Sequence, residues 1–289
     1  MDRNTFIFIF GTVAASGLLL ASGLGFFGGL VVAVSVFTLL WLVSLPLKNA
    51  GIVDIFWGVG FIVVGWYYLA ITAETPTAHG WLVCTLVTIW GLRLALHIGI
   101  RNRGAGEDFR YAAWREQDGF RFWWISYFKV FLLQAIILWI VSSPLLLAHL
   151  NSGRAEFGLI ELIGLGGWIF GFLFEVIADW QLSRFKTDPA NRGKVMRTGL
   201  WSLSRHPNYF GEAVVWWGIG LIALPSGGWL AFLGPLMITF MLLKVSGVAM
   251  LDAALVKRRP GYAEYVEDTP AFLPLPFARR GRRRAIGKL

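Results

Sequence analysis

The feature that most limits the possible folds is a series of apolar runs along nearly the whole chain. An α-helix needs roughly 20 apolar residues to cross the hydrocarbon core of a bilayer. Of the 289 residues, 56% are hydrophobic and only 15% are charged, whereas soluble domains carry about 25% charged residues. We therefore expect an all-α polytopic membrane bundle with seven to eight transmembrane helices. The expected spans are roughly 5–22, 25–45, 51–71, 81–99, 124–148, 157–180, 208–224 and 229–249.

The positions of the basic residues predict the orientation of these spans. With eight spans, 22 of the 26 Lys and Arg residues lie in loops and tails on one side of the membrane. Basic loops remain in the cytoplasm, so we expect both termini and the loops at 101–121 and 184–205 to be cytoplasmic. This distribution explains the net charge of +9 better than a nucleic-acid partner does. The localisation we expect is a bacterial inner membrane, with the site facing the cytoplasm.

The first span has two possible interpretations, and the few Cys and His residues limit the chemistry that the chain can carry. The first span is either a retained helix or a signal peptide, but no clean cleavage site follows it. The single Cys84 excludes an internal disulfide and a thiolate metal cluster. The four His residues lack the spacing of metal ligands, so we expect no metal.

An acidic residue stands near the start of the third span. Asp54 lies within an apolar run, and Trp57 follows three residues later on the same helix face. One interpretation is a helix cap or a carboxylate that reaches water. The functional interpretation is a carboxyl group, kept protonated by burial, that donates a hydrogen bond to a substrate.

The fourth span carries a stripe of polar and aromatic side chains on one helix face, Trp90, Arg93, His97 and Arg101. Arg101 and His97 can extend to the membrane interface, but Arg93 lies about two turns inside the span. A buried arginine needs a carboxylate or phosphate partner. We expect that partner to be Asp54.

Two segments on the predicted cytoplasmic side concentrate charge. The loop after the fourth span contains Asn102, Arg103, Gly104, Glu107, Asp108, Arg110 and Tyr111. It is either a generic solvated loop or a phosphate site, for which guanidinium groups and glycine amides are suitable donors. At the end of the sixth span, Glu175 and Asp179 share a face and Lys186 follows near it. Stacked acids repel unless a cation or donor lies between them, so this segment favours a functional site.

The seventh span begins with Arg205, His206, Pro207, Asn208 and Tyr209, and Glu212 follows one turn later. Interfacial anchoring would explain the Arg, His and Tyr side chains. It would not explain a carboxylate deeper in the span, because ionisable groups in hydrocarbon are costly. We interpret this set as part of a site.

Basic residues also follow the last span. Arg258 and Arg259 precede a turn at Pro260 and Gly261 and the aromatic residue Tyr262. The segment is either a short amphipathic helix with an aromatic turn or a lid over a cofactor.

These motifs resemble a known family. Residues 199–201 (Gly-Leu-Trp), 205–209 (Arg-His-Pro-Asn-Tyr), 211–212 (Gly-Glu) and the Pro-Gly-Tyr-x-x-Tyr segment at 260–265 resemble the steroid 5α-reductase superfamily, most of all its uncharacterised bacterial branch. Sterol C14-reductases and isoprenylcysteine carboxyl methyltransferases are more distant relatives. The resemblance covers about residues 50–277. It implies a membrane domain at 51–277 that holds NADPH in a cytosol-facing cavity. The apolar runs predict further transmembrane helices at 1–50, and the composition predicts a basic flexible tail at 278–289.

The resemblance also implies roles for individual residues. Asn208 and Glu212 match a family Asn and Glu on the nicotinamide side. Asp179 and Lys186 match a cofactor-binding Asp and Arg, and residues 102–104 match an Asn-Arg-Gly segment that touches the cofactor. The remaining cofactor contacts that we expect are Arg110, Tyr111, Glu175, Arg205, His206, Tyr209, Arg258, Arg259 and Tyr262.

The chain departs from the family on the substrate side. Steroid reductases carry a Gln-Glu pair and a Tyr that polarise the steroid ketone. Here the comparable region offers Asp54 and Trp57, and Gly91 stands about where the Tyr would be. Arg93 or His97 is our candidate for the missing donor.

We therefore expect an NADPH-dependent oxidoreductase of lipid metabolism that reduces an activated C=C bond in a steroid- or isoprenoid-like substrate. The residues expected to act in catalysis are Asp54, Trp57, Arg93, His97 and Glu212. The expected partners are a lipophilic small molecule and membrane lipid, with no nucleic acid. One alternative is methyl transfer from S-adenosylmethionine to a lipid-like acceptor, which explains the basic residues less well because that cofactor has no phosphates. The other is a non-catalytic lipid-binding or transport protein.

Overall fold

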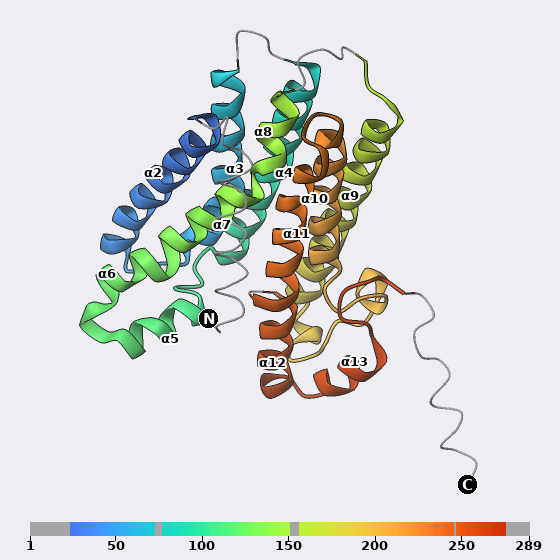
Figure 1. The fold of residues 1–289 in the computed structure, drawn as a ribbon. Helices are drawn as coiled ribbons and strands as arrows, with labels where there is room; N and C mark the ends of the chain where they lie inside the picture. Colours follow the sequence, from blue (N-terminus) through green and yellow to red (C-terminus); the bar gives the residue numbers. More distant parts are fainter. Residues whose placement is uncertain (1–23, 73–76, 151–155, 246, 276–289) are drawn as a thin grey trace. The chain divides into compact units, whose positions relative to one another are not determined.

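The chain folds into helices, as its apolar runs predict. A computed structural model describes residues 24–72, 77–150, 156–245 and 247–275, and within these ranges all regular elements are helical (Figure 1). The predicted all-α class is confirmed. The α-helices are α2 (Leu24–Leu47), α3 (Ile52–Ile71), α4 (Ala78–Asn102), α5 (Phe109–Asp118), α6 (Phe122–Ser126), α7 (Leu133–Val141), α8 (Ser143–His149), α9 (Leu159–Thr187), α10 (Pro207–Gly227), α11 (Leu233–Phe240), α12 (Val248–Arg258) and α13 (Tyr262–Asp268).

Shorter helical turns join several of these helices. The 3₁₀ turns are η1 (Gly119–Arg121), η3 (Pro189–Asn191), η4 (Gly199–Ser202) and η5 (Gly228–Phe232). The π-helical turns are η2 (Tyr127–Leu132) and η6 (Met241–Val245). Because α5 and η1 lead directly into α6, one longer helical segment, Phe109–His149, contains the span that we expected at 124–148.

Six described segments are long and apolar enough to cross a membrane: Gly25–Leu47, Ile52–Ile71, Ala78–Asn102, Phe109–His149, Leu159–Thr187 and Pro207–Arg258. They include seven of the eight expected spans. The expected spans 208–224 and 229–249 fall in one apolar stretch, which turns at Gly228, a residue with φ of 54°. The expected span 5–22 and the basic tail at 278–289 lie outside the described residues. The orientation of the chain stays a prediction.

The described residues form two compact units. The C-terminal unit contains 163–218, 238–245 and 247–275, and the N-terminal unit contains 24–72, 77–150, 156–162 and 219–237. The expected division at residues 50 and 277 is a different one, based on sequence resemblance, and stays a prediction.

In the N-terminal unit, α3 and α4 pack with their backbones in contact. A Cβ atom on Gly58 would overlap the backbone of Gly91, and a Cβ on Gly91 would overlap that of Gly58. Figure 1 shows α2 and α7 beside this pair. Trp139 of α7 is 1% exposed, and its indole N–H donates to the carbonyl oxygen of Phe26 at 2.8 Å. Close glycine packing and large aromatic side chains thus fill the core of this unit.

In the C-terminal unit, glycines set the register of α9 against α10. A Cβ on Gly171 would lie 2.7 Å from the carbonyl oxygen of Gly211, and a Cβ on Gly218 would lie 2.6 Å from that of Gly164. The two helices are therefore antiparallel, with 164 opposite 218 and 171 opposite 211. Only glycine permits so close an approach. The end of α9 consequently lies against the beginning of α10.

The C-terminal segment of the same unit returns to the turn that precedes α10. The amide N–H of Arg205 donates to the carbonyl oxygen of Pro270 at 2.9 Å, and that of Leu275 donates to Leu203 at 3.2 Å. The hydroxyl of Ser204 donates to the carbonyl oxygen of Phe272 at 2.8 Å. These bonds fix the entry of the chain into α10.

Candidate functional site

A buried acid and an amide meet where α9 ends and α10 begins. The side-chain amide of Asn208 donates to Oδ1 of Asp179 at 3.2 Å. Asp179 is 6% exposed and Glu175, one turn earlier on α9, is 2% exposed. The glycine register places these groups together, because Gly211 packs directly on the backbone of Glu175. Glu212 is half-buried on α10, one turn after Asn208.

The next turns of α9 line an open pocket of about 530 Å³ in the C-terminal unit. Its walls are Trp180, Gln181, Arg184, Phe185, Thr187, Asp188, Asn191, Met196, Thr198 and Gly199. The guanidinium of Arg184 lies 5.5 Å from the centre of the Trp180 ring. The wall is held in place by Gln181, whose Oε1 accepts the amide N–H of Leu200 at 3.0 Å. The pocket thus combines aromatic faces with a cationic group.

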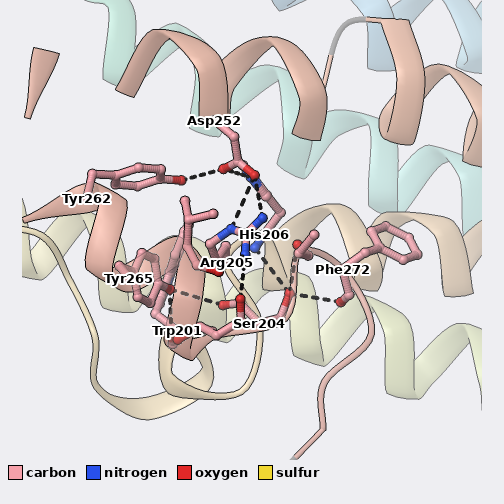
Figure 2. A network of polar contacts seen from close by, with 11 residues as sticks. Trp201, Ser204, Arg205, His206, Asp252, Tyr262, Tyr265 and Phe272 are labelled. Carbon is pink, nitrogen blue, oxygen red and sulfur yellow. Dashed lines mark hydrogen bonds and ion pairs between the residues drawn. The ribbon is translucent and has the colours of Figure 1, made fainter. Parts of the chain in front are cut away.

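Asp252 of α12 is the centre of a second polar cluster (Figure 2). Its Oδ2 accepts hydrogen bonds from Nε and Nη2 of Arg205, at 3.2 and 2.7 Å. Its Oδ1 lies 2.9 Å from Nε2 of His206 and accepts the hydroxyl of Tyr262 at 2.6 Å. One carboxylate therefore connects α12, α13 and the turn before α10.

Arg205 also binds the C-terminal end of α13 and the residue that follows it. Its Nη1 donates to the carbonyl oxygens of Val266, at 2.9 Å, and of Thr269. Tyr265 adds to this connection, because its hydroxyl donates to the carbonyl oxygens of Trp201 and Ser204. The guanidinium of Arg205 thus bonds to backbone oxygens as well as to Asp252, and it fastens the C-terminal segment to the start of α10.

The two tyrosines of α13 are held as hydrogen-bond donors. Burial raises the pKa of Tyr262, and the hydrogen bond to Asp252 raises it further. Burial likewise raises the pKa of Tyr265, against the lowering effect of Arg205. Both phenols therefore keep their protons at all physiological pH values.

In the N-terminal unit, Asp54 lies in a polar row. Its Oδ1 accepts the hydroxyl of Tyr111 at 2.7 Å and its Oδ2 accepts Nη2 of Arg110 at 2.5 Å. The amide of Gln134 donates to the Tyr111 oxygen at 3.3 Å, and the indole N–H of Trp57 donates to Oε1 of Gln134. An indole N–H can only donate, so it fixes the orientation of the Gln134 amide. The proton of Tyr111 is then directed to Asp54.

The two acids of the loop before α5, Glu107 and Asp108, are paired with arginines of α5. Glu107 accepts two hydrogen bonds of 2.8 Å from Arg115 and one of 2.7 Å from the amide of Ala50. Burial acts to raise the pKa of Glu107, but these bonds outweigh it and lower the pKa. Asp108 behaves in the same way, because its bonds to Arg110 outweigh the effect of burial and lower its pKa.

The same loop borders a smaller cavity of about 160 Å³, lined by Asn49, Gly51, Ile52, Ile55, Gly99, Asn102, Arg103, Gly106 and Asp108. Gly104 and Gly106 have φ values of 76° and 73°, which glycine adopts without strain. Within the described ranges, no three His, Cys, Asp or Glu side chains are grouped so that they can hold a metal ion.

Comparison with known proteins identifies the family. The model of DUF1295, described as a protein of unknown function, matches residues 40–269. The chain belongs to this family. It is also 28% identical over 212 residues to an uncharacterised protein of Schizosaccharomyces pombe, an alignment that covers 65% of this chain. That alignment spans 61% of the fungal protein, so the relative is considerably longer than the matched part. No solved structure matches the chain.

Several predicted site residues of this DUF1295 member do come together. Asp179 and Asn208 are bonded in the C-terminal unit, and Glu175 and Glu212 lie on the same two helices. Lys186 is exposed near the end of α9, and Tyr209 stacks flat on His206 at 5.4 Å between ring centres. The wider grouping with an NADPH cofactor stays a prediction.

Other predicted residues have different partners from those expected. Asp54 binds Arg110 and Tyr111 rather than Arg93, because α5 brings its first turn over the beginning of α3. Both oxygens of Asp54 accept hydrogen bonds, so the expected donor role does not fit this geometry. Arg93 and His97 are half-buried on α4.

The basic residues assigned to phosphate binding also differ among themselves. Arg110 is bonded to two carboxylates, and Arg205 is bonded to Asp252. Arg103 and Arg258 are exposed, and Arg259 donates to the carbonyl oxygen of Lys194 at 3.3 Å. Nε2 of His206 and the hydroxyl proton of Tyr262 are both bonded to Asp252, so these atoms do not make the expected cofactor contacts.

Two important residues were not predicted. Gln134 orients Tyr111 from within a strongly apolar run, and Asp252, just after the last expected span, bonds to three side chains. The available signal was the same for both: a polar residue in a segment that is otherwise apolar, which is costly without a partner.

Proposed function

We propose that this protein is an NADPH-dependent membrane reductase that acts on an activated C=C bond of a lipophilic, steroid- or isoprenoid-like substrate. The observation that carries the proposal is the buried pair of Asp179 and Asn208, positioned by glycine contacts between two helices long enough to cross a membrane. A bundle that only had to cross a bilayer would avoid such groups. The resemblance to steroid 5α-reductases implies that these two residues bind NADPH.

The pocket on α9 supports a nucleotide ligand. Its volume of about 530 Å³ falls within the range of roughly 300–1,000 Å³ that is usual for small-molecule sites. Trp180 and Phe185 offer aromatic faces for a base, and Arg184 offers a cation for a phosphate. S-Adenosylmethionine would also use the aromatic faces and offers the cation one carboxylate, but it has no phosphate group.

The proposed reaction is a reduction across an enone. When bound, NADPH would supply a hydride to the carbon β to the carbonyl group, and water would supply the proton that adds to the α carbon. The C=C π bond breaks, two C–H bonds form, and NADPH is oxidised to NADP⁺. During hydride transfer, negative charge develops on the carbonyl oxygen, and a hydrogen-bond donor at that oxygen stabilises the transition state.

Two groups carry protons next to Asp54, the hydroxyl of Tyr111 and the guanidinium of Arg110, and of these Tyr111 is our candidate donor because Arg110 is already paired with two carboxylates. Asp54 is an acceptor, and Gln134 keeps the Tyr111 hydroxyl in place. We therefore transfer the donor role from Asp54 to Tyr111. Asp54 then holds the hydroxyl proton of Tyr111 in the resting protein.

The first test is binding of NADPH, NADH and S-adenosylmethionine to the detergent-purified protein by calorimetry. We expect NADPH to bind, and Asn208→Ala to weaken it about tenfold, equivalent to about 1.4 kcal/mol. Gln117→Ala, which removes an exposed amide on α5, is the matched control and keeps wild-type affinity. Binding of S-adenosylmethionine without either dinucleotide would show that the reductase proposal is wrong and favour methyl transfer.

The second test is NADPH oxidation in the presence of a panel of enones, including Δ4-3-ketosteroids and isoprenoid enones. We expect Tyr111→Phe to lower turnover by about 10²–10³, the usual effect of losing one oxyanion donor. Unchanged turnover in Tyr111→Phe would remove this residue from the mechanism.

A further inference from the structure

We infer that Asp252 is a positioning residue that fixes the tautomer of His206, so that Nδ1 of His206 is the nitrogen that accepts a hydrogen bond from the bound cofactor. The cofactor part of this inference rests on the proposed function. The tautomer part rests on the contacts within the C-terminal unit alone, and the two parts are tested separately.

Asp252 carries a negative charge in this cluster. Its side chain is 15% exposed and lies 2.7 Å from Nη2 of Arg205, which is 9% exposed. Two guanidinium N–H groups point to Oδ2, while the Tyr262 hydroxyl points to Oδ1. A carboxyl group surrounded by donors and paired with a guanidinium is ionised, because each of these bonds favours the charged form.

The position of the proton on His206 follows from this charge. An ionised carboxylate only accepts hydrogen bonds, so Nε2 of His206, 2.9 Å from Oδ1, must carry the hydrogen. In the neutral imidazole the other nitrogen, Nδ1, then holds the lone pair. A carboxylate that orients the imidazole through one nitrogen determines the chemistry of the other.

The imidazole of His206 is also restrained. The His206 backbone N–H donates to the hydroxyl oxygen of Ser204 at 3.1 Å. His206 is 4% exposed, and its ring lies nearly parallel to the Tyr209 ring, with 3° between the planes. Figure 2 shows how the Asp252 carboxylate lies above His206 and Arg205. The ring is thus restrained by its backbone, by a stacked aromatic ring and by a carboxylate.

The chemical class of the partner follows from the lone pair. Nδ1 accepts from an N–H or O–H group, and NADPH carries both types, as a carboxamide and as ribose hydroxyls. His206 stands two residues before Asn208, the residue that the resemblance assigns to the nicotinamide side. An imidazole with the opposite tautomer would present N–H at that position and would repel the same donor.

The test uses Asp252→Asn and nitrogen NMR of protein labelled with ¹⁵N-histidine. The chain has four histidines, and His206→Gln assigns the signal. In Asp252→Asn, the Asn oxygen must face Arg205, because a guanidinium has donors only. The Asn amide then faces His206 and donates to Nε2. We therefore expect hydrogen on Nε2 in the wild type and on Nδ1 in Asp252→Asn.

The matched control is Tyr262→Phe, which removes one donor from Oδ1 but leaves the carboxylate. We expect it to keep the wild-type tautomer. In calorimetry, Asp252→Asn should weaken NADPH about tenfold, the effect of one lost hydrogen bond, while Glu264→Ala, which removes an exposed acid of the same unit, should change affinity less than twofold.

Each outcome separates the two parts. Hydrogen on Nδ1, or on both nitrogens, in the wild-type protein would overturn the tautomer assignment, whether or not Asp252→Asn folds. A tautomer change with unchanged NADPH affinity would overturn the cofactor contact and leave the tautomer assignment standing. If the wild-type protein binds no NADPH at all, the proposed function falls, and the NMR result still decides the role of Asp252.

Discussion

Replacing Asp252 by Ala should destabilise the C-terminal unit far more than replacing any exposed acid there. The substitution leaves the Arg205 guanidinium without its carboxylate in a place where only 9% of the side chain is exposed. Breaking a buried ion pair typically costs about 3–5 kcal/mol, because an uncompensated charge stays buried. Since Asp252 is itself 15% exposed, water reduces the penalty, and we expect about 3 kcal/mol.

Glu264 provides the matched comparison in the same unit. It lies 3.6 Å from Nη2 of Arg197, but its side chain is 69% exposed and that of Arg197 is 37% exposed. Exposed ion pairs contribute about 0–1 kcal/mol, because water screens them and two long side chains must be ordered. Glu264→Ala should therefore be nearly neutral, although it also removes one acid paired with one arginine.

The assay is equilibrium unfolding in mixed micelles of a mild detergent and SDS, followed by tryptophan fluorescence. Arg205→Ala combined with Asp252→Ala should cost less than the sum of the two single substitutions, because neither charge remains without its partner. Equal destabilisation by Asp252→Ala and Glu264→Ala would refute the reasoning, since it would mean that burial of the pair contributes nothing.

Three further predictions concern other parts of the chain. Gly211→Ala should abolish NADPH binding, because its Cβ would lie 2.7 Å from the backbone of α9. Calorimetry on a variant shown to be folded tests this. Stability should be lost as pH falls through the low pKa of Glu107, since Arg115 stabilises only its ionised form; a Glu107→Gln variant should lack this part of the pH dependence in thermal unfolding. His79 and Glu161 lie 3.6 Å apart and are 0% and 2% exposed, so a double-mutant cycle should give a coupling energy of about 1–3 kcal/mol; additive effects would show that the two side chains do not interact.

The fold class and the position of most helices were predictable from the sequence. Apolar runs of the right length specify helices directly, because backbone groups in hydrocarbon must be bonded within the helix. The exact ends were less predictable. Helix α9 continues to Thr187, seven residues beyond the expected end, because its last turns carry charged residues that can stay helical outside the apolar layer.

The candidate site was predictable by residue type and not by pairing. Asn208 and Asp179 were both identified, and the glycine register brings them together. The expected pairing of Asp54 with Arg93 was wrong, because spacing along α3 and α4 cannot show that α5 returns over their ends. The role of Asp252 was missed for a similar reason, since the donors that reach it come from residues 46 and 47 positions earlier and 10 positions later.

The place where the two units divide has a consequence for making this protein in pieces. Domain boundaries normally fall in exposed linkers, but here the division falls within α9, α10 and α11, between 162 and 163, 218 and 219, and 237 and 238. A polypeptide cut at any of these points would end in the middle of a helix, with unpaired backbone groups at membrane depth. We expect neither unit to be obtainable as an independent fragment. Insertion of reporter proteins should instead use an exposed turn between helices that is outside both cavities, such as Gly119–Arg121.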